Sequence, residues 1–174
     1  IDRSVRYALG RSNSRDGGTA HSMAITDLFD LPPSGPLVGI DPGSKTLGIA
    51  ACDAGRLIAS PVETIRKGRK LAPSLDRLFE IVDQRRTVGL VIGLPLNMDG
   101  SEGPRAQSAR ALARNIIARR DIPIAFQDER LSSSEAERAM IAGDLSRARR
   151  AELIDASAAA IILQTAIDRL ANAS

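Results

Sequence analysis

Residues 37–50 form two apolar runs separated by a tight turn, and a single carboxylate, Asp41, ends the first of them. A Pro-Gly pair follows Asp41 at once, which favours a turn between two paired strands. The pattern predicts strands over residues 37–41 and 46–53, with Asp41 at the edge of the sheet. A carboxylate there needs a positive partner, either a basic side chain or a metal ion, because burying a lone charge is costly.

The rest of the chain alternates strand and helix patterns. A third strand at residues 57–65 would continue an antiparallel meander, and the apolar run at residues 88–94 is typical of a strand buried on both faces. The remaining expected elements are helices through residues 71–82, around residues 109–116, from Ser132 or Ser134 onward and over residues 152–170, and a strand at residues 122–127. This order predicts an α/β fold with a mixed five-stranded sheet and helices on both faces.

Residues 1–22 differ from the rest, being rich in Arg, Ser and Gly and lacking apolar periodicity. We expect them to be a vector-derived or disordered leader, and residues 23–174 to form one domain. Four arginines and two aspartates in the leader account for two of the chain's three net positive charges, so overall charge is weak support for nucleic-acid binding. No apolar run has membrane-spanning length, so we expect a cytoplasmic protein with no membrane partner.

The chain has one histidine, His21, and one cysteine, Cys52. Because His21 lies in the leader, residues 23–174 have no histidine base, no Ser-His-Asp triad and no histidine-ligated metal. A single cysteine excludes an internal disulfide and a cysteine-rich zinc site. Any chemistry must therefore use carboxylates, hydroxyls, lysine or arginine.

Acidic residues stand at the ends of three predicted elements. Asp41 ends the first strand, Asp128 and Glu129 follow the last strand, and Asp155 lies near the start of the last helix. Each acid alone could simply pair with a nearby base or favour a helix start. Together, converging carboxylates without histidine form an oxygen-rich site that suits Mg²⁺ or Mn²⁺, which can support phosphodiester cleavage.

Basic and polar side chains of the candidate loops could bind phosphates, for which the planar fork of arginine is well suited. The candidate nucleic-acid contacts are Lys45, Arg105, Arg130, Arg147, Arg149, Arg150, Asn97 and Ser101. We expect the three arginines at 147–150 to lie in a basic loop. Because the domain has only three aromatic residues, recognition of backbone shape is expected rather than base stacking on an aromatic platform. The loop at residues 97–103 could contact the substrate or a second copy, or be a purely structural turn.

Four segments of the chain resemble the YqgF/RuvX family, in the same order. They are residues 39–50 (GIDPGSKTLGIA), 91–101 (VIGLPLNMDGS) and 128–132 (DERLS), and Asp155 with its alanine-rich helix. The resemblance covers about residues 37–170 and implies a ribonuclease H-like fold. Members of this family are described as Holliday junction resolvases and as nucleases that mature the 5′ end of pre-16S rRNA.

The resemblance implies a Mg²⁺- or Mn²⁺-dependent endonuclease with Asp41, Glu129 and Asp155 as metal ligands. Many ribonuclease H-like nucleases carry their second acid on the fourth strand, but residues 91–94 contain none. The acidic pair at the end of the fifth strand is expected to replace it, with Glu129 preferred to Asp128.

The expected activity is cleavage of structured RNA, with pre-16S rRNA as substrate, by a monomer or weak homodimer. Three alternatives stay open on the sequence alone. They are resolution of four-way DNA, an actin-like ATP-binding module suggested by the first hairpin, and an inactive scaffold that binds ribosomal RNA.

Overall fold

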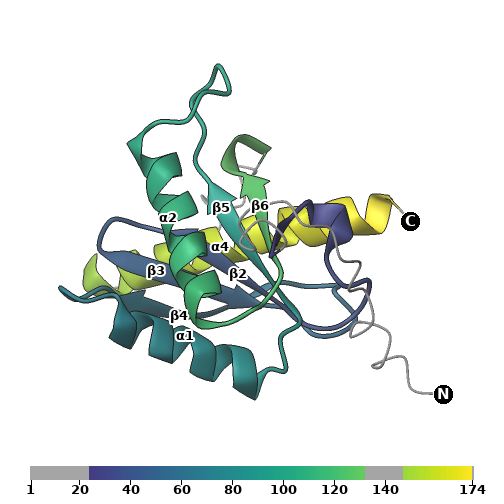
Figure 1. The fold of residues 1–174 in the computed structure, drawn as a ribbon, viewed down its shortest axis with the longest axis horizontal. Helices are drawn as coiled ribbons and strands as arrows, with labels where there is room; N and C mark the ends of the chain where they lie inside the picture. Colours follow the sequence, from purple (N-terminus) through teal and green to yellow (C-terminus); the bar gives the residue numbers. More distant parts are fainter. Residues whose placement is uncertain (1–23, 132–146, 174) are drawn as a thin grey trace, which may run out of the picture.

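The computed structural model describes residues 24–131 and 147–173, with the backbone alone for residues 131 and 147–155. One six-stranded sheet, with the strand order β1-β6-β5-β2-β3-β4, forms its centre (Figure 1). In chain order, the elements are β1 (Ile25–Thr26), the 3₁₀ helix η3 (Leu28–Asp30), β2 (Leu37–Pro42), β3 (Thr46–Ala51), β4 (Ser60–Arg66), α1 (Ala72–Gln84), β5 (Gly89–Leu94), α2 (Pro104–Arg119), β6 (Ile124–Asp128), the 3₁₀ helix η4 (Glu129–Leu131) and α4 (Arg147–Asn172).

The first three long strands form the predicted meander, because β2 pairs antiparallel with β3 and β3 pairs antiparallel with β4. The chain then crosses to the other side of β2, where β5 runs parallel to it and β6 runs parallel to β5. This arrangement confirms the predicted α/β class and mixed sheet. A sixth strand, β1, pairs with β6 at the edge. It has two residues, too few to show an alternating pattern, which is why five strands were expected.

Several expected boundaries differ from the structure by one to five residues. Strand β4 begins at Ser60 rather than at residue 57, and α4 begins at Arg147, so residues 147–150 belong to the helix and not to a basic loop. The expected leader and the helix from Ser132 or Ser134 lie outside the described residues.

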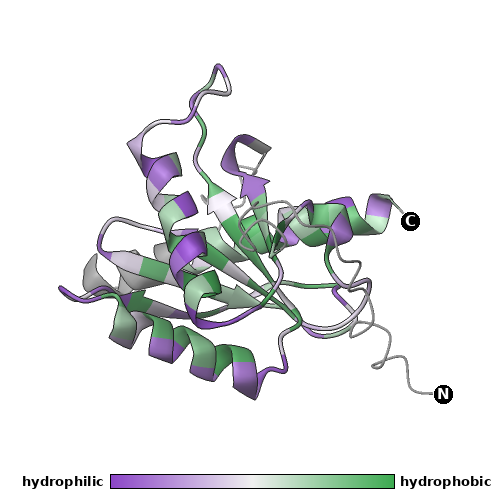
Figure 2. Cartoon of the chain, in the orientation of Figure 1, coloured by the Kyte–Doolittle hydropathy of each residue, from purple (hydrophilic) through white to green (hydrophobic). Residues whose placement is uncertain are grey.

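Helices cover both faces of the sheet, as the sequence predicts (Figure 1). Alternate residues of a strand point to opposite faces, so Ile40 and Ile92 join the core beneath α1 and α2. Leu37 and Val91 join the core beneath α4 on the other face. Figure 2 shows the apolar strands between helices whose outer surfaces are hydrophilic. No helix in the described ranges combines the length and apolar character needed to cross a membrane.

Helix α4 crosses the sheet directly over Gly39 of β2. A Cβ atom at this position would lie 2.7 Å from Leu163 Cβ and 3.0 Å from the carbonyl oxygen of Ala159. Both atoms belong to the packed part of the helix, so they cannot swing away as the end of a long side chain could. Glycine at position 39 therefore sets how closely α4 approaches the central strand.

We expect Gly39→Ala to lower the free energy of unfolding by about 1–3 kcal/mol, because the added methyl group overpacks the contact with α4. Denaturant unfolding should be compared with that of Gly68→Ala, since an added Cβ at Gly68 meets no atom closer than 4.0 Å. An unfolding free energy equal in the two variants would contradict the close packing of α4 on β2.

Candidate active site

Asp41 lies near the end of the central strand, on the face covered by α4. It is half-buried and shares its side of β2 with Gly39. Hydrogen bonds hold the turn after it, among them those from the Gly43 N–H to the carbonyl oxygen of Thr46 at 2.9 Å and from Lys67 Nζ to the carbonyl oxygen of Gly43 at 2.5 Å. Burial of Lys67 lowers the pKa of its ammonium group. Lys67 therefore fixes the backbone that follows Asp41.

Glu129 reaches the same face from the end of β6. Within β6, Gln127 points toward α4, where its Oε1 accepts a hydrogen bond from Arg169 Nη1 at 3.0 Å. The Glu129 Oε1 atom is buried and lies 2.6 Å from the place that a Cβ on Gly93 would occupy. Ile162 Cδ1, from α4, is equally close to that place. The Glu129 carboxylate therefore lies over Gly93, between β5 and α4.

Strand register brings Asp41 and Glu129 to neighbouring positions. Strands β2 and β5 are paired in parallel with Ile40 opposite Ile92, so Asp41 and Gly93 are the next pair along. Neighbouring strands lie about 4.8 Å apart. The Glu129 carboxylate, which lies over Gly93, is thus one strand away from Asp41 on the same face. It takes the space that a side chain on β5 would fill. That it replaces an acid of that strand as a metal ligand stays a prediction.

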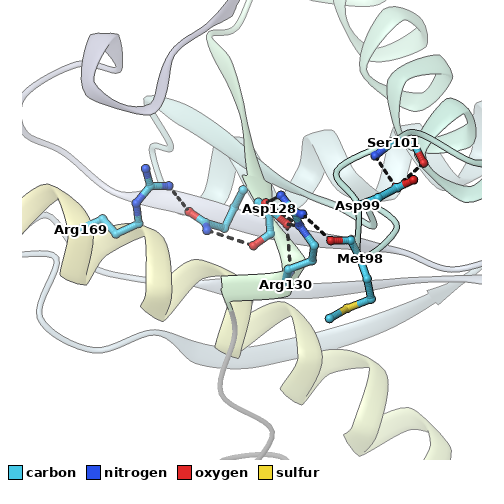
Figure 3. Close-up of polar contacts among 7 residues, drawn as sticks. Met98, Asp99, Ser101, Asp128, Arg130 and Arg169 are labelled. Carbon is cyan, nitrogen blue, oxygen red and sulfur yellow. Dashed lines mark hydrogen bonds and ion pairs between the residues drawn. The ribbon is translucent and has the colours of Figure 1, made fainter.

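The neighbouring Asp128 points to the opposite face. It shares its side of β6 with Phe126, whose ring centre lies 5.0 Å from the guanidinium of Arg110 on α2. Arg130 pairs with Asp128, with 2.7 Å between Nη2 and Oδ2, and its hydrogen bonds hold the pKa of the Asp128 carboxyl below its ordinary value (Figure 3). The ion pair weighed as the structural alternative is therefore confirmed for Asp128, and this acid does not join Asp41.

Asp155 lies in α4, four residues before Ala159, but its side chain is outside the described residues. The same holds for the side chains of Arg147, Arg149 and Arg150. Among the side chains that are described, no three acids, histidines or cysteines are grouped closely enough to hold a metal ion. The role of Asp155 as a third metal ligand therefore stays a prediction.

The other candidate phosphate contacts fall into two groups. Lys45, in the turn between β2 and β3, and Arg105, in the first turn of α2, are exposed. Asn97 and Ser101 are hydrogen-bonded to each other, with 2.9 Å between Asn97 Nδ2 and Ser101 Oγ. Arg130 is engaged in the ion pair described above. The first group is available to a ligand, whereas the second shapes the protein itself.

Several residues around Asp41 and Glu129 have no obvious signal in the sequence. Lys67 stands out only as one charge in a basic segment. Gly93 interrupts an apolar strand, a position that can mark the close approach of another group. The contact of Gln127 with Arg169 joins residues 42 positions apart, and no local pattern predicts it.

Comparison with known proteins agrees with these observations. Residues 35–169 match the family model RuvX, described as Holliday junction resolvase. A protein of Phenylobacterium zucineum is 52% identical over 156 residues, covering 86% of this chain and 99% of that protein. A protein of Rhodobacter capsulatus is 56% identical over 142 residues, covering 82% of this chain and 89% of that protein. Both are named "Putative pre-16S rRNA nuclease".

Among solved structures, Thermus thermophilus RuvC in complex with a Holliday junction substrate superimposes with a TM-score of 0.51 at 15% identity, over 79% of this chain and 96% of that one. At this identity the likeness concerns the fold alone, which is ribonuclease H-like. The family match and the close relatives together carry the assignment. The chain belongs to the RuvX family.

Proposed function

We propose that this protein is a divalent-metal-dependent endonuclease that cleaves structured RNA, with the 5′ region of pre-16S rRNA as its substrate. The observation that carries the proposal is the Glu129 carboxylate lying over Gly93, one strand away from Asp41 on the same face. Like charges placed this close repel each other, and a cation between them removes the repulsion. Membership of the RuvX family and the names of the relatives support nuclease activity and the RNA substrate.

The donor atoms fit a hard divalent cation. Asp41 and Glu129 offer carboxylate oxygens only, and residues 23–174 contain no histidine. Such a set suits Mg²⁺ or Mn²⁺ better than Zn²⁺. Asp41, Glu129 and Asp155 would hold the ion. When bound, it would supply a positive charge for the scissile phosphate and for the water that attacks it.

The contribution of the protein is to keep the two carboxylates in place. Asp41 is carried by the central strand, and the turn after it is fixed by Lys67. Glu129 is confined between Gly93 and Ile162. Asp41 is thus held by the backbone of β2 and Glu129 by its packing over Gly93, which favours a fixed relative orientation of the two acids.

Cleavage assays with two substrates test the proposal. A labelled RNA that spans the 5′ end of pre-16S rRNA and a four-way DNA junction should be incubated with the protein in Mg²⁺, Mn²⁺ or EDTA. We expect the RNA to be cut at a defined 5′ position with either ion and to stay intact in EDTA. Cutting in EDTA would contradict the metal dependence.

The same assays separate the remaining candidates. Preferential cutting of the junction would favour DNA resolution, which the description of the family supports. Saturable binding of the RNA without cutting under any metal condition would favour a non-catalytic scaffold.

A further inference from the structure

The segment between β5 and α2, residues 95–103, projects beyond the end of the sheet (Figure 1). Its base is closed by an isolated antiparallel bridge between Leu96 and Glu102. The Glu102 carboxylate also pairs with Arg110 of α2, which ties the returning arm of the segment to the helix. The base of the projection is therefore fixed on both sides.

The tip of the projection, residues 97–101, is ordered by its own polar groups. The Asn97 N–H donates to the carbonyl oxygen of Ser101 at 2.9 Å, and the Gly100 N–H donates to the carbonyl oxygen of Asn97 at 2.8 Å. Asp99 Oδ1 accepts from the Ser101 N–H at 2.9 Å and from Ser101 Oγ at 2.6 Å. Gly100 has φ +87°, a conformation that glycine adopts without strain. The polar side chains of the tip thus build the turn.

Arg130 ties this tip to the end of β6. Its Nη1 donates to the carbonyl oxygen of Met98 at 3.3 Å, while Asp128 holds the rest of the guanidinium (Figure 3). The same Nη1 lies 3.6 Å from the place of a Cβ on Gly100. Because Arg130 directly follows Glu129, the tip is anchored one residue from a carboxylate of the candidate active site.

The side chain of Met98 is what this anchored tip presents to solvent. It is 90% exposed, more than any other large apolar side chain in the described residues. A single exposed apolar residue is common on protein surfaces and carries no meaning by itself. Met98, however, stands on a turn that is held in three places. Hydrogen bonds order its tip, the Leu96–Glu102 bridge closes its base, and Arg130 joins it to the end of β6. The structure therefore places an exposed apolar side chain on a turn that Arg130 joins to the end of β6.

We propose that Met98 packs against the face of an unpaired or terminal nucleobase next to the cleaved bond, and that the Asp128–Arg130 pair positions it for this contact. The inference rests on the proposed nuclease function and narrows the substrate to duplexes that adjoin unpaired nucleotides. A thioether packs favourably on an aromatic ring, and a base exposes its face only where stacking ends. Methionine is among the apolar side chains that proteins place against base steps.

Binding measurements in the Asp41→Asn background, which prevents cutting, test the contact. The probe is a hairpin RNA with a single-stranded 5′ flank that carries 2-aminopurine at its first unpaired position. We expect Met98→Ala to weaken binding by up to about tenfold and to remove the change in 2-aminopurine fluorescence. Met98→Leu should keep most of the affinity. Leu57→Ala, which removes an apolar side chain that is 77% exposed in the segment before β4, is the matched control and should bind as the parent does.

Substitution of Arg130 tests the positioning role of the Asp128–Arg130 pair in cleavage assays. Arg130→Lys keeps the charge but loses the forked contact with Asp128, so KM should rise as in Met98→Ala while kcat is retained. Combining the two changes should be no worse than Met98→Ala alone, because both act through one contact.

The outcomes separate this inference from the proposed function. Equal affinity and equal fluorescence for Met98→Ala and Leu57→Ala would overturn the role of Met98, even if the wild-type protein cuts RNA. A wild-type protein that binds the probe and never cuts it would remove the proposed function, and the comparison of the Met98 variants would still decide the contact. Absence of binding to the probe would overturn the inference directly.

Discussion

Replacement of Asp41 by asparagine is expected to abolish cleavage and to leave the protein folded. The substitution keeps the shape of the side chain but removes one of the three charges that would hold a divalent ion. We expect kcat to fall at least about 1000-fold, as when a group essential to the transition state is removed. The melting temperature should stay the same or rise, because the repulsion between Asp41 and Glu129 is relieved.

Single-turnover cleavage and thermal unfolding of the same preparation measure both effects. Asp83→Asn is a suitable control, because Asp83 is an exposed acid paired with Arg120 on the other side of the sheet, where an ion pair contributes little. Severe unfolding of Asp41→Asn would instead assign Asp41 a structural role. Cleavage at the wild-type rate would exclude it from the active site.

The second large effect is expected from Gly93→Ala. The added Cβ would lie 2.6 Å from both Glu129 Oε1 and Ile162 Cδ1, so both side chains must move. Displacement of a catalytic group by about 1 Å can cost a factor of about 100 in rate, and we expect a loss of this size per folded molecule. The free energy of unfolding should fall by less than in Gly39→Ala, by about 1 kcal/mol, since both neighbours are the ends of flexible side chains.

A double-mutant cycle shows whether this loss acts through Glu129. If it does, Gly93→Ala combined with Glu129→Gln should cut no more slowly than Glu129→Gln alone. Gly68→Ala serves as the control for a glycine replaced where there is room. If the rate loss of the double variant equals the product of the two single losses, Gly93 affects cleavage by a route other than Glu129.

The main lines of the fold follow from the sequence because local patterns encode them. The Pro-Gly turn after Asp41 and the alternation around it predict the meander, and the apolar run ending at Leu94 predicts a central parallel strand. Strand β1 could not be predicted, because its two residues are ordered only by pairing with β6. The sequence predicts too late a start for α4, since an arginine-rich stretch suits a solvated helix as well as a loop.

The candidate site is harder to predict from local sequence patterns than the fold. Sequence patterns single out Asp41 and the acidic pair, but the choice between Asp128 and Glu129 depends on which face each acid takes at the end of β6. The observations that bear on that choice are the alternation of β6, the register of β5 against β2, and the space left by Gly93. These are relations between distant segments, which local composition and spacing do not express.

The position of α4 has a consequence for the synthesis of the protein. This helix comes after every strand in the chain, yet it packs on β2, β3 and β4, which are made long before it. Folding that begins while the chain is being made can form the meander early, but the contacts that join its two ends must wait. Until α4 docks, the space above Gly39 and Gly93 lacks the helix that covers it among the described residues. A growing chain therefore carries Asp41 for most of its synthesis without a completed candidate site, and on the proposed function it could cut nucleic acid only after the last helix has folded into place.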